Sequence, residues 1–248
     1  MISSKPIYMD FGNTRLKMLI DGTVFHIDYD EKLIYNISQA IAPHEDNSVL
    51  YFSSVNIPKS DKVIKELSAY TFVSIESLFA KNKYIDLTQV KGMGTDRILG
   101  ILGAMTEFTP PFVTIDCGTM ITMNLLSQSL SVLGGIIFPG LRTMAKAAHN
   151  YTAALPLIQT FDNHALYGTN TTNALQTGIL HACLGAINHS LQQWYDSAIL
   201  PNEAPIIFTG GDGLFLYNQL LLKSKNAHYK EQLIINGMKF CVEADPII

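Results

Sequence analysis

The chain has 248 residues, of which 48% are hydrophobic and only 15% are charged, so it is long enough for one large domain or two ordinary ones with a real core. Seventeen basic and 21 acidic side chains leave a formal net charge of −4. No run of Lys or Arg follows a phosphate backbone, which argues against nucleic acid as the main partner.

Three cysteines, Cys117, Cys183 and Cys241, are too few and too widely spaced for a disulfide framework or a zinc site. They favour a reducing compartment, and we expect a cytoplasmic protein. The first ten residues contain one Lys and no apolar segment of signal-peptide length. The long uncharged stretch 117–141 is broken by polar residues and Pro139, and it predicts two strands joined by a turn at 127–129 rather than a membrane span.

The first part of the chain is rich in predicted strands. Apolar segments predict strands at 7–9, 16–20, 24–29, 48–55 and 71–77. The dipeptide Asp21-Gly22 predicts a tight hairpin between the second and third of these. A helix is expected over 59–69, and another from Asp96 to Met105, where an acidic residue in the first turn is typical of a helix N-terminus.

A second part then repeats the layout of the first. A strand over 112–115 runs into Asp116-Cys-Gly-Thr119 and a further strand over 121–126, as the first strand runs into Asp10-Phe-Gly12. This predicts two α/β half-domains, 1–110 and 111–248, with a cleft between them. The remaining predicted elements are helices over 141–149, 172–195 and 214–222 and a strand over 205–208.

The motif from Asp10 to Lys17 is a candidate phosphate loop. Gly12 lets a backbone approach a phosphate, Asn13 and Thr14 offer donors, Lys17 carries positive charge, and Asp10 suits Mg²⁺. Alone, the motif is more consistent with an ordinary capped hairpin. The second copy at Asp116–Thr119 favours a phosphate clamp with one carboxylate on each side.

Two further motifs have both a structural and a functional interpretation. Thr209–Gly213 ends a strand and begins a helix, a geometry that presents backbone N–H groups to an anion, although it could be only a tight turn. Gly94-Thr95-Asp96-Arg97 is explained most simply by an N-cap Asp96 and an exposed Arg97. In the functional interpretation, Asp96 accepts a proton from a substrate hydroxyl and Arg97 holds an anionic group.

Taken in order, the motifs resemble those of the type III pantothenate kinases. They are Asp10–Lys17, Gly94–Arg97, Asp116–Thr122, Gly134–Gly140, Tyr151–Pro156, Asn170–Ala174 and Thr209–Gly211. The resemblance implies the actin-like ATPase superfold, with two ribonuclease-H-like half-domains and ATP in the cleft. It also implies ATP-dependent phosphorylation of pantothenate to 4'-phosphopantothenate, the first step of coenzyme A biosynthesis, by a cytoplasmic homodimer that uses Mg²⁺ and a monovalent cation, K⁺ or NH₄⁺.

The same resemblance implies roles for individual residues. ATP contacts would come from Asp10, Phe11, Gly12, Asn13, Thr14, Arg15, Leu16, Lys17, Thr119, Gly210 and Gly211. Pantothenate contacts would come from Gly94, Thr95, Asp96, Arg97 and Thr171, with Asp96 as the catalytic base. Cation ligands would be Asp116 and Asp10.

One departure from the family pattern leaves alternatives open. Leu87 stands where many members have a substrate-contacting Tyr, and nearby Tyr84 is a candidate replacement. A kinase for another small hydroxyl compound, such as a sugar, therefore stays open. So does a non-catalytic nucleotide-binding regulator of the same fold, against which the intact Asp96 and Arg97 argue.

Overall fold

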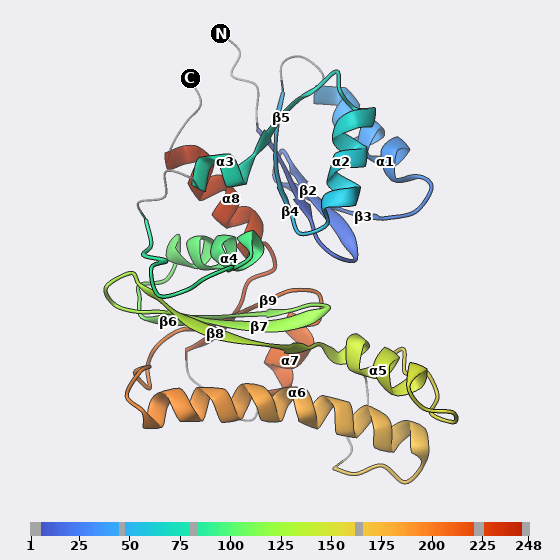
Figure 1. The fold of residues 1–248 in the computed structure, drawn as a ribbon, viewed down its shortest axis with the longest axis vertical. Coiled ribbons are helices and arrows are strands. Elements are labelled where there is room, and N and C mark those ends of the chain that lie inside the picture. Colours follow the sequence, from blue (N-terminus) through green and yellow to red (C-terminus); the bar gives the residue numbers. More distant parts are fainter. Residues whose placement is uncertain (1–5, 45–47, 80–83, 162–165, 221–225, 245–248) are drawn as a thin grey trace. The chain divides into compact units, whose positions relative to one another are not determined.

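The computed structural model describes residues 6–44, 48–79, 84–161, 166–220 and 226–244. The chain divides into two compact units, each built on a five-stranded sheet with helices (Figure 1). Unit 1 consists of Met1–Asp86, Val90–Glu107 and Gln232–Ile248, and unit 2 of Leu87–Gln89 and Phe108–Glu231. The predicted division after residue 110 lies close to the Glu107–Phe108 break, but the segment from Gln232 belongs to unit 1 and not to the second half of the chain.

The sheet of unit 1 has the strand order β3-β2-β1-β4-β5. Its strands are β1 (Ile7–Phe11), β2 (Arg15–Ile20), β3 (Thr23–Asp28), β4 (Val49–Ser54) and β5 (Thr71–Ser74). The first three are antiparallel, and β4 and β5 continue the sheet parallel to β1. The predicted hairpin is confirmed, because Asp21 and Gly22 join β2 to β3 with φ of 47° and 83°.

Helices cover both faces of this sheet. They are α1 (Leu33–Ile41), η1 (Ala42–His44), α2 (Ile57–Glu66), α3 (Ile75–Phe79), α4 (Thr95–Met105) and α8 (Leu233–Ala244). Apolar residues of α1 and α2 share one buried core with alternate residues of β1 and β2 (Figure 1). On the other face, α8 contacts β1, and α3 and α4 contact β4.

Two predicted elements of unit 1 differ most from the structure in their boundaries, and the other predicted strands differ by one or two residues at their ends. The strand expected over 71–77 ends at Ser74, because the Ser74 hydroxyl accepts a 3.2 Å hydrogen bond from the Glu76 N–H and donates to the Glu76 carboxylate. These local bonds favour the start of a helix over a longer strand. The helix expected over 59–69 spans Ile57–Glu66 instead, with Pro58 in its first turn, where a missing N–H costs nothing.

Helix α8 packs closely on α4 of unit 1 at two glycines, one on each helix. A Cβ atom on Gly103 of α4 would lie 3.0 Å from the Gly237 nitrogen and still closer to the Leu233 oxygen. A Cβ atom on Gly237 would lie 2.7 Å from the Leu99 carbonyl carbon. The two helix backbones therefore meet where neither carries a side chain. This contact, together with the contacts of α8 with α3 and β1, places the C-terminal segment in unit 1.

The sheet of unit 2 repeats the topology of the first, with the order β10-β9-β6-β7-β8. Its strands are β6 (Phe112–Cys117), β7 (Met120–Leu126), β8 (Val132–Pro139), β9 (Ile206–Thr209) and β10 (Ala227–Tyr229). Again three successive strands are antiparallel and two later ones are parallel to the first. The predicted pair of ribonuclease-H-like α/β half-domains is therefore confirmed.

Within its described residues, unit 2 has the helices α5 (Leu141–Asn150), α6 (Thr171–Asp196) and α7 (Gly213–Gln219). The long α6 runs along one side of the sheet and buries Ile179, Cys183, Ile187 and Leu191 against it (Figure 1). The helix predicted over 214–222 ends at Gln219, and positions 221 and 222 lie outside the described residues. In the described ranges, no helix is both long enough and apolar enough to cross a bilayer.

Candidate active site

Asp10 lies near the end of the central strand of unit 1. Strand β1 places it opposite Lys17 on antiparallel β2 and beside Ser53 on parallel β4. Only 6% of Asp10 is exposed, whereas Lys17 is half-buried. A buried carboxylate is costly unless it is paired, hydrogen-bonded or bound to a cation.

The predicted phosphate loop continues from Asp10 into the turn between β1 and β2. Asn13, Thr14 and Arg15 are exposed at the turn between β1 and β2. Phe11 and Leu16 are fully buried in the core, so they could meet a nucleotide only through their backbone.

Tyr29 supports this turn and was not singled out by the sequence. Its hydroxyl donates a 2.8 Å hydrogen bond to the Gly12 carbonyl oxygen. Burial raises the pKa of Tyr29 well above its ordinary value, and the Asp10 carboxylate raises it further, so the phenol stays a donor at neutral pH. The Lys59 ammonium lies 5.4 Å from the centre of the Tyr29 ring, within cation–π range. An isolated aromatic residue after a strand offers no sequence signal for such a role.

The start of α4 carries the candidate base. Gly94 is the N-cap, with extended backbone at φ −64° and ψ 148°, and Asp96 lies in the first turn. Oδ1 of Asp96 accepts a 2.9 Å hydrogen bond from the Arg97 N–H. The simplest interpretation of the motif is therefore wrong in both parts, because Gly94 is the cap and Arg97 is half-buried.

Asp96 and Arg97 form a half-buried pair of opposite charges. Burial lowers the pKa of the Arg97 guanidinium, and the neighbouring Asp96 carboxylate opposes that shift. The guanidinium remains a cation at neutral pH. A carboxylate fixed beside a cation suits proton acceptance next to an anionic substrate group.

Asp116 occupies in unit 2 the position that Asp10 occupies in unit 1. Each is the last residue but one of the first strand of its sheet. Asp116 is half-buried and lies between Thr122 of β7 and Thr209 of β9 in the strand register. In the turn that follows, Gly118 donates a 3.1 Å hydrogen bond to the Met120 carbonyl oxygen, and Thr119 is exposed.

The Gly210–Gly211 turn packs directly on this strand end. Gly210 has a φ of 91°, and a Cβ atom there would lie 2.6 Å from the Cys117 carbonyl oxygen and closer still to Oδ1 of Asp116. The Asp212 N–H donates a 2.9 Å hydrogen bond to the same Cys117 oxygen. Two motifs far apart in the sequence thus form one site in unit 2.

Cys117 lies within this site but is fully buried. Burial raises the pKa of its thiol well above 9.0, and the Asp116 and Asp212 carboxylates raise it further. The thiol is therefore a packed, protonated side chain rather than a nucleophile.

The first turn of α5 contacts the turn between β6 and β7. The Gly140 N–H and the Thr143 hydroxyl both donate to the Thr119 carbonyl oxygen, at 3.0 and 2.5 Å. Arg142, between them, places Nη2 3.4 Å from Oδ1 of Asp212. Neither Arg142 nor the Asp212 side chain was assigned a role from the sequence, and the adjoining Pro139-Gly140 turn was the available signal.

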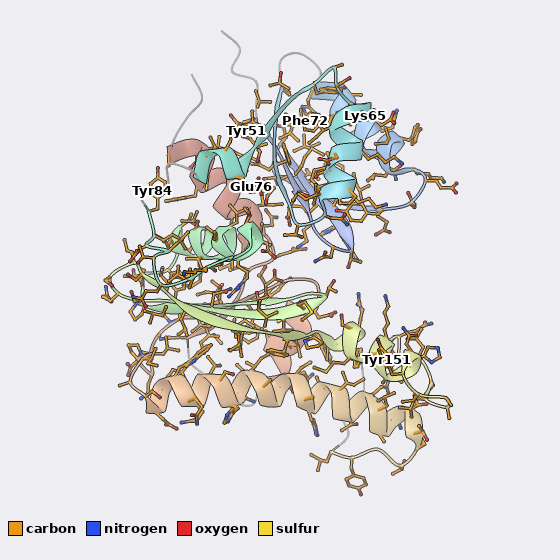
Figure 2. The ribbon with its side chains drawn as sticks, viewed as in Figure 1. Tyr51, Lys65, Phe72, Glu76, Tyr84 and Tyr151 are labelled. Atoms are coloured by element: carbon orange, nitrogen blue, oxygen red, sulfur yellow. The ribbon has the colours of Figure 1, made fainter. Side chains whose placement is uncertain are left out.

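The residues predicted to contact pantothenate lie in different units. Thr171 is the exposed first residue of α6, next to the N-cap Asn170, whereas Gly94–Arg97 belong to unit 1. Leu87 is half-buried. The ring of Tyr84, which Figure 2 labels, packs edge-on against Phe240 of α8, with the ring centroids 4.9 Å apart.

The candidate cation contacts of this chain are single carboxylates rather than clusters of ligands. Among the described residues, no three His, Cys, Asp or Glu side chains gather into a metal site. A single carboxylate such as Asp10 fits Mg²⁺ chemistry, because this ion keeps several waters and shares phosphate oxygens.

Comparison with known proteins places these features in a family. The type III pantothenate kinase family model matches residues 7–193. A type III pantothenate kinase of Flavobacterium johnsoniae is 30% identical over 220 residues, covering 86% of this chain and 88% of that protein. A solved structure of a Campylobacter jejuni protein described as a Baf family transcriptional activator shares the fold with a TM-score of 0.66 and 23% identity, covering 97% of this chain and 98% of that one. So does a Sinorhizobium meliloti protein described as a 2-dehydro-3-deoxygalactonokinase, with a TM-score of 0.58 and 12% identity, covering 98% of this chain and 100% of that one.

These neighbours establish the predicted actin-like fold, and the match to the family model spans most of the chain. With its paired Asp-Gly turns and the Gly94–Arg97 helix start, this chain belongs to the type III pantothenate kinase family.

Proposed function

We propose that this protein transfers the γ-phosphoryl group of ATP to pantothenate, giving 4'-phosphopantothenate and ADP in the first step of coenzyme A biosynthesis. The observation that carries the proposal is the family match over residues 7–193, a range that contains Asp10, Asp96 and Asp116. Relatives across that range are named type III pantothenate kinases.

Phosphoryl transfer requires alignment and charge neutralisation more than covalent chemistry. In unit 1, Lys17 and the backbone of the Gly12–Thr14 turn would contact the phosphates. In unit 2, Thr119 and the Gly210–Gly211 turn would do so. Mg²⁺, held through Asp10, would neutralise phosphate charge, and a monovalent cation, K⁺ or NH₄⁺, would lie at Asp116.

Asp96 would act as the general base. It would accept the proton of the primary hydroxyl of pantothenate as the bond from that oxygen to the γ-phosphorus forms and the bond to the ADP oxygen breaks. The Arg97 cation would hold the pantothenate carboxylate, with Gly94, Thr95 and Thr171 as further contacts. The half-burial of Asp96 and Arg97 supports this assignment, because ionic contacts strengthen away from water.

We also infer a cytoplasmic homodimer. Helix α6 has no Lys, Arg, Asp or Glu from Thr171 to Tyr195. Before this helix, Tyr151, which Figure 2 labels, is 90% exposed and Tyr167 is 73% exposed. Uncharged helical faces and exposed aromatic residues are typical of subunit interfaces. Three free, buried cysteines support a reducing compartment, and the net charge of −4 supports small-molecule rather than nucleic-acid partners. Light scattering at increasing protein concentration tests the dimer.

The kinase proposal is tested by ADP release from ATP and Mg²⁺, with and without pantothenate, in K⁺ and in Na⁺. We expect pantothenate-dependent turnover that is higher in K⁺. Asp96→Asn should lower kcat by about 10²- to 10⁴-fold with little change in the affinity for ATP. Turnover with a sugar but not with pantothenate would instead favour a different hydroxyl substrate, which Leu87 leaves open. ATP binding without turnover on any substrate would favour a regulator.

A further inference from the structure

Arg142 stands where three loop segments of unit 2 meet. It is the second residue of α5, and the first turn of that helix is tied to the β6–β7 turn. A Cβ atom on Gly140 would lie 3.1 Å from the Thr119 oxygen, and the Gly140 N–H already donates to that oxygen. The position of Arg142 relative to the Gly118–Thr119 turn is therefore set by the backbone.

The guanidinium of Arg142 is directed by an ion pair. Nη2 lies 3.4 Å from Oδ1 of Asp212, the residue that follows the Gly210–Gly211 turn. The Arg142 side chain is 61% exposed, whereas that of Asp212 is only 15% exposed. The ion pair thus joins the mostly solvated Arg142 guanidinium to the mostly buried Asp212 carboxylate, next to the Gly210–Gly211 turn.

This ion pair does little for the fold. The Asp212 N–H already bonds to the Cys117 carbonyl oxygen at 2.9 Å, and Gly210 packs against the same residue. An ion pair whose cation is mostly solvated adds modest stability to such a backbone arrangement. What the pair does accomplish is to fix the direction of a planar cation that has several donors and is partly open to water.

The Gly118–Thr119 and Gly210–Gly211 turns lie beside negatively charged side chains, which a cation would offset. Asp116 and Asp212 place two carboxylates where the proposed function puts the negatively charged phosphates of ATP, and a positive group there would offset the repulsion. The positive end of the α5 dipole acts in the same sense.

We propose that Arg142 is a nucleotide-binding residue whose guanidinium bridges Asp212 and the phosphates of ATP. This inference rests on the proposed kinase function and adds a residue that none of the compared motifs assigns. A guanidinium is suited to the role because it can hold a carboxylate on one edge and a phosphate on another.

The test compares Arg142→Gln with Lys146→Gln. Lys146 is an exposed cation one turn further along α5, so the control removes the same charge from the same helix. Calorimetry on the full-length protein gives the dissociation constants for ATP, ADP and adenosine, and steady-state assays give KM for ATP and kcat. We expect Arg142→Gln to weaken ATP and ADP binding about tenfold, to leave adenosine binding unchanged, and to make ATP binding less sensitive to salt. Arg142→Lys should recover part of the loss, and Lys146→Gln should bind all three ligands as the wild type does.

Equal ATP affinity in Arg142→Gln and Lys146→Gln would overturn the inference, provided that the wild type turns over pantothenate. A parallel loss of adenosine affinity would also overturn it, because the defect would then not be specific to phosphate. A wild-type protein that binds no nucleotide would overturn the proposed function and this inference together.

Discussion

Gly94 leaves room for the carboxylate of Asp96. A Cβ atom at position 94 would lie 2.6 Å from Oδ1 of Asp96, and that same oxygen accepts the 2.9 Å hydrogen bond from the Arg97 N–H. The position of the candidate base thus depends on the absence of a side chain two residues earlier.

Gly94→Ala should therefore impair catalysis more than folding. The added methyl group would displace the Asp96 carboxylate, and we expect kcat with pantothenate to fall on the order of 10- to 100-fold. Gly100→Ala is the matched control, because it adds a methyl group to the same helix with no atom outside that helix's own backbone within 4 Å. An unchanged kcat in Gly94→Ala, with melting temperatures like those of the wild type, would contradict this role for glycine.

Gly210→Ala should disturb the Asp116 carboxylate. The substitution forces a side chain onto a φ of 91° and into contact with Oδ1 of Asp116, whereas Gly211→Ala meets nothing within 4 Å. We expect Gly210→Ala to lose about 2 kcal/mol of unfolding free energy and most of the stimulation by K⁺ over Na⁺. Gly211→Ala should keep both. Chemical denaturation and turnover in the two salts measure the difference, and equal behaviour of the two variants would refute the prediction.

Gly237→Ala should loosen the packing of α8 on α4. The methyl group would lie 2.7 Å from the Leu99 carbonyl carbon, so the helices would have to separate. We expect a loss on the order of 3 kcal/mol in the free energy of unfolding, measured by urea titration. Gly100→Ala again serves as the control on α4. If both variants unfolded at the wild-type urea concentration, the close helix contact would not exist in solution.

Alkaline pH should destabilise the fold through buried thiols. Burial and the Asp212 carboxylate raise the pKa of Cys183 from 9.0 to about 11, and burial raises that of Cys241 from 9.0 to about 12. Between these values the folded protein keeps protons that the unfolded chain releases, so stability is complete below pH 9 and falls as pH rises toward 11 and 12. Urea titrations across this range measure the slope. Cys183→Ala should make it shallower, and a slope unaffected by the substitution would exclude Cys183 as its source.

Most elements of the central sheets could be predicted because their signals are local. The Asp21-Gly22 turn, the apolar stripe of α6 and the recurrence of Asp10 and Asp116 at strand ends all lie within short windows of sequence. Helices α1, α3 and α8 were not predicted. In the case of α3, hydrogen bonds between Ser74 and Glu76 decided where the strand gave way to a helix.

The sequence by itself determined the class of the fold, the repeated half-domain and the residue types of the candidate site, because periodicity and turn chemistry depend on neighbours along the chain. Only the tertiary structure decided that α8 joins unit 1, that Tyr29 supports the Gly12 turn, and that Arg142 meets Asp212. Each of these contacts joins residues distant in sequence. A local pattern shows that a helix has an apolar face or that a residue is charged, but the partner is selected only when the folded chain brings the two surfaces together.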